Sequence, residues 1–135
     1  MRSEANAVTL LLLLTLSACS VNIEEEIRTS PEGVATQSYI SSALQGKELS
    51  PHYGECATER DRAEGHVFWK EFEGLAESLK DVQFVASSGN SKSSSLNLMF
   101  TGGETERKAV VDVALEGERW RICRISTGHL LIDDM

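Results

Sequence analysis

The apolar residues of this chain change their spacing once, near Asp81, and this change limits the folds that the chain can form. Before Asp81 they recur at helical spacing, as in the stripe between Phe68 and Leu79. After it, apolar and polar residues alternate, which is typical of strands with one buried face. Helices grouped ahead of an antiparallel sheet predict an α+β fold, with the helices packed on one face of a curved sheet.

Three segments of the first half are expected to be helical. The first begins at Ser30-Pro31-Glu32, where a capping serine, a proline at the first helical position and an acidic residue in the first turn are typical of a helix start. Gly46 ends this segment, and Pro51 opens the second. The third covers residues 66–79. The charged stretch 58–65 has no apolar stripe, so we expect it to be helical at best and largely exposed.

About four strands are expected in the second half, over residues 82–87, 96–100, 107–115 and 118–125. In the last of them, Trp120 and Ile122 share one face, whereas Cys123 and Ile125 share the other. Either a bulge reverses this alternation, or the face with Cys123 is the buried one. We prefer the second interpretation, because a bond from Cys123 to the helical half requires it.

The amino-terminal residues carry the strongest functional signal. Residues 7–16 form an apolar run that is about half as long as the ~20 residues a membrane-spanning helix needs. A run of this length is typical of a secretory signal peptide. Leu16-Ser17-Ala18-Cys19 completes it and resembles the lipobox of bacterial lipoproteins. The alternative is an ordinary secreted protein that is cut near Ala18 and keeps Cys19 as a thiol.

The lipobox resemblance implies a division of the chain and a location. Residues 1–18 would be the signal peptide, 19–29 the lipidated Cys19 with a solvated tether, and 30–135 a small α+β domain. Cys19 would carry a thioether-linked diacylglycerol and an N-linked acyl chain such as palmitate, which is enough for stable anchoring in a membrane. Because Ser20, and not an aspartate, follows Cys19, the resemblance favours the outer membrane facing the periplasm over the inner membrane.

The remaining cysteines predict one disulfide. With Cys19 carrying lipid, Cys56 and Cys123 form an even pair in an oxidising compartment. The alternative is two buried thiols. The three histidines lack metal-ligand spacing, and no phosphate-binding loop is present, so we expect neither a metal nor a cofactor. The formal net charge of −8 argues against non-specific binding of nucleic acid.

The order of the expected elements resembles a known superfamily. Helices followed by long hairpins that end in Gly117-Glu118-Arg119-Trp120-Arg121-Ile122 are similar to the cystatin-like half-barrel of the nuclear transport factor 2-like superfamily. Another small α+β sheet topology is the alternative. The superfamily includes enzymes of the ketosteroid-isomerase type, and the resemblance therefore implies a pocket with an acid or base.

The candidates for such a pocket are few. Asp112 and His66 are weak catalytic candidates: Asp112 alternates with two valines and is expected on the solvated side of its strand, and His66 opens a helix. Trp69 and Trp120 are expected either to line a pocket or, as we prefer, to fill the core. The sequence therefore predicts a lipid-anchored binding or assembly module, with an envelope protein or an apolar small ligand as partner. A pocket enzyme of the isomerase or hydratase type is the alternative.

Overall fold

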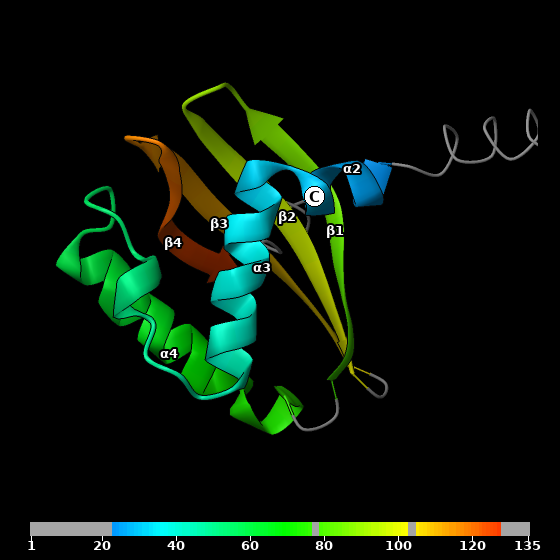
Figure 1. Cartoon of the computed structure of the whole chain (residues 1–135). Helices are drawn as coiled ribbons and strands as arrows, with labels where there is room; N and C mark the ends of the chain where they lie inside the picture. Colours follow the sequence, from blue (N-terminus) through cyan, green and yellow to red (C-terminus); the bar gives the residue numbers. More distant parts are fainter. Residues whose placement is uncertain (1–22, 77–78, 103–104, 128–135) are drawn as a thin grey trace, which may run out of the picture.

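The structure is a computed structural model that describes residues 23–76, 79–102 and 105–127 (Figure 1). Its elements in chain order are α2 (Ile23–Thr29), α3 (Pro31–Leu44), the 3-10 helix η1 (Ser50–His52), α4 (Glu59–Ala76), β1 (Leu79–Gly89), β2 (Ser93–Gly102), β3 (Thr105–Glu116) and β4 (Arg119–Thr127). The four strands form one antiparallel sheet in the order β1-β2-β3-β4. The α+β fold predicted from the sequence is confirmed.

No helix in the described ranges is long and apolar enough to span a bilayer.

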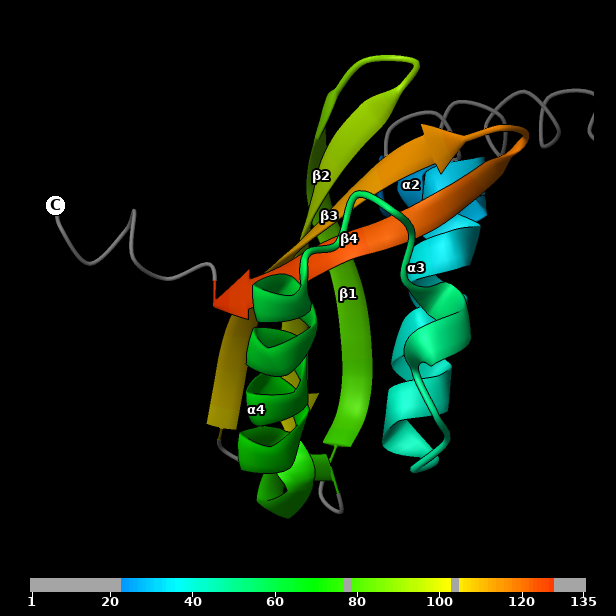
Figure 2. The same ribbon diagram turned by 90° about the vertical axis from the view of Figure 1, so that its left-hand side faces the viewer.

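The hydrophobic core lies between α3, α4 and one face of the sheet (Figure 2). Alternate positions of the strands face the helices, as the sequence pattern predicts. The largest fully buried apolar side chains are Tyr39, Phe72, Phe84, Phe100, Ile40, Leu96, Leu98, Ile122, Val111 and Val113. Burial of each such side chain stabilises the fold by roughly 1.5–3 kcal/mol. The core between helices and sheet is therefore filled by side chains.

The two longer helices begin with side-chain caps. Ser30 accepts a hydrogen bond from the backbone N–H of Gly33 and precedes Pro31, so the predicted start of α3 is confirmed. Before α4, Thr58 accepts from the N–H of Asp61, whose carboxylate accepts from the N–H of Thr58. After this reciprocal cap, residues 59–65 form the first part of α4, which continues without a break into the helix that was predicted from residue 66.

The pairing of β3 with β4 contains a bulge. Asp112 pairs with Arg124 and Val113 pairs with Ile122, so Cys123 is an extra residue on β4. Because of this extra residue, Ile122 and Ile125 both face the core, at 1% and 2% exposure. The preferred interpretation, in which the face of Cys123 is the buried one, is therefore wrong, and the alternative with a bulge is confirmed.

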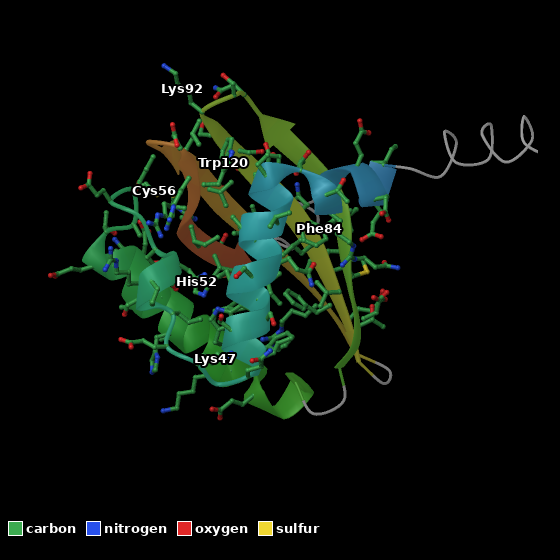
Figure 3. All side chains as sticks on the ribbon, viewed as in Figure 1. Lys47, His52, Cys56, Phe84, Lys92 and Trp120 are labelled. Carbon is green, nitrogen blue, oxygen red and sulfur yellow. A yellow bond between two sulfur atoms is a disulfide. The ribbon has the colours of Figure 1, made fainter. Side chains whose placement is uncertain are left out.

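The predicted disulfide is present. Cys56 lies just before α4 and is bonded to Cys123 at the bulge, with their Cα atoms 5.1 Å apart (Figure 3 labels Cys56). Around it, the Glu116 carboxylate accepts hydrogen bonds from the N–H groups of Glu55 and Cys56. The loop before α4 is thus fixed to β4 by one covalent bond and by contacts to the β3–β4 hairpin.

The sequence suggested that residues 23–29 belong to a solvated tether. In the structure they form α2, which packs against β1. Arg28 donates a hydrogen bond to the carbonyl of Val82 (2.8 Å), and Glu24 accepts one from the N–H of Phe84 (3.0 Å). Ile27 adds a buried apolar contact. Since β1 is an edge strand, these two side chains bind backbone groups that would otherwise be open to another strand.

This contact also changes the ionisation of Glu24. The N–H of Phe84 is the main cause of a lowered pKa at the Glu24 carboxyl, and Arg28, 2.6 Å away, lowers the pKa further. The carboxylate form that docks α2 is therefore the one present at neutral pH. The prediction of a tether failed because three adjacent glutamates resemble a solvated spacer, whereas one of them is a partner for the sheet edge.

Candidate functional site

The sequence-predicted acidic candidate, Asp112, lies on the face of the sheet opposite the core. Its neighbours Val111 and Val113 are buried under the helices, whereas Asp112 accepts a hydrogen bond from the Ser95 hydroxyl and lies 3.6 Å from Arg124 Nε. These contacts join neighbouring strands on the open side of the sheet. Asp112 therefore does not face the helices.

The predicted tryptophans lie in different places. Trp69, on α4, is 9% exposed and packs edge-on against Tyr39, Phe72 and Phe100. Trp120 is half-buried at the margin of the core. Trp69 belongs to the core, which is the interpretation that the sequence analysis preferred. It also forms part of the wall of a cleft. Cys19, the predicted lipid attachment site, lies outside the described residues.

This cleft, called the α3–α4 cleft from here on, has a volume of about 730 Å³. It lies between the C-terminal end of α3, the segment 46–53 and α4; Lys47 in Figure 3 marks its position. Leu49, Tyr53 and Trp69 form its apolar wall. Its volume falls within the range of pockets that hold small molecules.

Charged side chains surround the apolar wall of the α3–α4 cleft. The cleft is lined by three cations and two carboxylates, together with one histidine: Lys47, Arg62, Lys70, Glu48, Glu73 and His66. All six are exposed. The second catalytic candidate from the sequence, His66, therefore lies at this cleft and not in the core.

Two tyrosines that the sequence analysis did not identify join the core to this cleft. Trp69 Nε1 donates a hydrogen bond to Tyr39 Oη (3.0 Å), and Tyr39 Oη lies 2.8 Å from Tyr53 Oη. Tyr39 is fully buried, whereas Tyr53 is half-buried and lines the cleft. Burial raises the pKa of both phenols, so both are protonated at neutral pH.

The Tyr53 hydroxyl approaches the backbone of α4 at Gly65. A Cβ atom at Gly65 would lie 2.4 Å from Tyr53 Oη but 3.5 Å from Tyr53 Cζ. A glycine inside a helix costs about 1 kcal/mol relative to alanine, and here it leaves room for the hydroxyl. Gly65 stands inside α4, where a glycine is unfavourable, and this is the one signal in the sequence that could have indicated a close contact here.

We expect Gly65→Ala to lower the free energy of unfolding by about 1 kcal/mol, although helix propensity alone predicts a gain of that size. The new methyl group would push Tyr53 away from Tyr39 and break their hydrogen bond. In a Tyr53→Phe background the clash is absent, and the same substitution should stabilise the protein. Urea unfolding of the four proteins measures this difference. An equal gain in both backgrounds would contradict the assigned contact.

Comparisons of the chain with protein-family models, with curated proteins and with solved structures found no match.

Proposed function

We propose that this protein is a lipid-anchored protein of the bacterial cell envelope and that its α+β domain is a binding module. The observation that carries the anchor is the Leu16-Ser17-Ala18-Cys19 pattern at the end of an apolar run. The pairing of Cys56 with Cys123 supports it, because Cys19 is then the one cysteine of the chain that the disulfide does not use. A disulfide is also what an oxidising compartment outside the cytoplasm favours.

The proposed location follows from the same pattern. Ser20 after the lipidated Cys19 favours the outer membrane, with the domain facing the periplasm. We further infer that the fold is the cystatin-like half-barrel of the nuclear transport factor 2-like superfamily. The helices that precede a four-stranded antiparallel sheet support this inference.

The α3–α4 cleft supports a binding role over the enzymatic alternative. An isomerase of the predicted type needs an acid or base enclosed in a pocket between helices and sheet. In this structure the weak candidate Asp112 lies on the open face of the sheet, and His66 is exposed on α4. The cleft, by contrast, combines an apolar wall with several polar side chains, which is the usual composition of a ligand site.

Metabolic labelling tests the anchor. Cells that produce the protein are grown with an alkyne analogue of palmitate, and the purified protein is examined for the label. We expect wild type to be labelled and Cys19→Ala to lose the label, because the thiol of Cys19 is the lipid acceptor. A variant with both Cys56→Ser and Cys123→Ser is the matched control and should keep the label. Equal labelling of Cys19→Ala and wild type would overturn the proposal.

A further inference from the structure

The α3–α4 cleft is lined by Tyr53, whose hydroxyl has only one hydrogen-bond partner, Tyr39, among the residues that the structure describes. Tyr39 Oη accepts a bond from Trp69, which can only donate. The buried Tyr39 hydroxyl must place its own hydrogen on an acceptor, and its other hydrogen-bond partner among the described residues is Tyr53. Tyr39 therefore donates to Tyr53 Oη. The hydrogen of Tyr53 is then not used by Tyr39, and Tyr53 is one of the residues that line the cleft.

The series of hydrogen bonds that ends at Tyr53 makes the Tyr53 hydroxyl a stronger donor. Each hydrogen bond in the series Trp69 to Tyr39 to Tyr53 polarises the next, so the Tyr53 O–H is a better donor than an isolated phenol. Arg62 lies over the Tyr53 ring, with its guanidinium carbon 5.7 Å from the ring centroid, and donates to the carbonyl of Gly54. The terminal donor is thus fixed in position beside a cation.

The charges around the donor favour an anion. Within the described ranges, none of Lys47, Arg62 and Lys70 lies within 4.0 Å of a carboxylate oxygen, whereas three other arginines do. Against them stand Glu48, which accepts a bond from Ser50, and Glu73. The side chains that line the cleft therefore carry one more positive than negative charge, in a chain whose formal net charge is −8. Asp61, outside this lining, adds a negative charge that acts on Tyr53.

We propose that the α3–α4 cleft binds a small anion with a flat apolar body, such as an aryl carboxylate. The apolar body would pack on Leu49 and Trp69, and the anionic group would accept the hydrogen bond of Tyr53 near Lys47 and Lys70. This inference rests on the binding role proposed for the domain and is independent of its lipid anchor.

Calorimetric titration of the full chain in an uncharged detergent tests this inference, with 2-naphthoate as the probe and protein-free micelles as the baseline. We expect saturable binding of 2-naphthoate and at least tenfold weaker binding of 2-naphthamide, which keeps the rings but lacks the charge. Tyr53→Phe should weaken 2-naphthoate binding about tenfold, the loss expected when a hydrogen bond to a charged group is removed.

A matched pair of lysine variants keeps the test independent of folding. Lys47→Gln, at the cleft, should weaken 2-naphthoate binding roughly two- to fivefold. Lys92→Gln removes the same charge at the distant β1–β2 turn (Figure 3) and should leave binding unchanged. Equal effects of the two variants, or no saturable binding of 2-naphthoate, would overturn the inference. Equally strong binding of 2-naphthamide would also overturn the inference, but it would leave a binding role for the cleft. The lipid anchor is tested separately, by the labelling of Cys19.

Discussion

Removal of the Cys56–Cys123 disulfide should lower the free energy of unfolding by roughly 4 kcal/mol. The two cysteines are 67 positions apart, and a cross-link that closes a loop of this length removes much conformational freedom from the unfolded chain. The loss would be a large part of the 5–15 kcal/mol that stabilises an ordinary domain. Urea unfolding of wild type and of a variant with both Cys56→Ser and Cys123→Ser measures it.

The double substitution is preferred because a single one would leave the other cysteine of the pair as a free thiol on the domain. Reduction of wild type with dithiothreitol is the control and should give the same midpoint as the double variant. The double variant itself should not respond to the reductant. A midpoint that is the same in wild type and in the double variant would show that the disulfide does not stabilise the domain.

Phe100→Ala should cost about 3–5 kcal/mol, the usual range for truncation of a buried phenylalanine. Phe100 is 0% exposed and lies on the central strand β2. Its ring packs against Phe72 at 4.8 Å and against Trp69 at 6.1 Å between centroids. The substitution therefore leaves a cavity at the place where α4 meets the sheet. Thermal and urea unfolding measure the loss.

Two further substitutions show whether this cost comes from the core. Phe100→Leu keeps most of the apolar volume and should cost much less than Phe100→Ala. Val85→Ala, on the neighbouring strand β1 at a side chain that is 51% exposed, should change the free energy of unfolding by no more than about 0.5 kcal/mol. A cost at Val85 as large as that at Phe100 would contradict the assigned core.

The elements that the sequence predicted are those whose causes are local. The alternation of apolar residues is enough to indicate strands such as β2, and Ser30 with Pro31 is enough to indicate the start of α3. The disulfide between Cys56 and Cys123 followed from the count of cysteines and the expected compartment.

The features that sequence reasoning missed depend on contacts between distant residues. The docking of α2 requires Glu24 to meet the N–H of Phe84, 60 positions away. The bulge at Cys123 reverses a face without any change in composition. The donor chain at the cleft joins Tyr39 to Tyr53 through a space that Gly65 provides. None of these pairings leaves a periodic pattern that could be found by inspection.

Under the proposed lipid anchor, the attachment of α2 to the edge of β1 also limits how the domain can lie relative to a membrane. With Cys19 as the lipid-bearing residue, four peptide units reach Ile23, the first residue of α2, and these extend at most about 14 Å. The α+β domain would then stay within this distance of the bilayer, with its β1 side close to the lipid headgroups. Figure 1 shows α2 and segment 46–53 at opposite ends of α3, a 14-residue helix about 20 Å long, and the residues that line the cleft lie at its C-terminal end. Molecules diffusing in the surrounding fluid would therefore reach the cleft without first entering the bilayer.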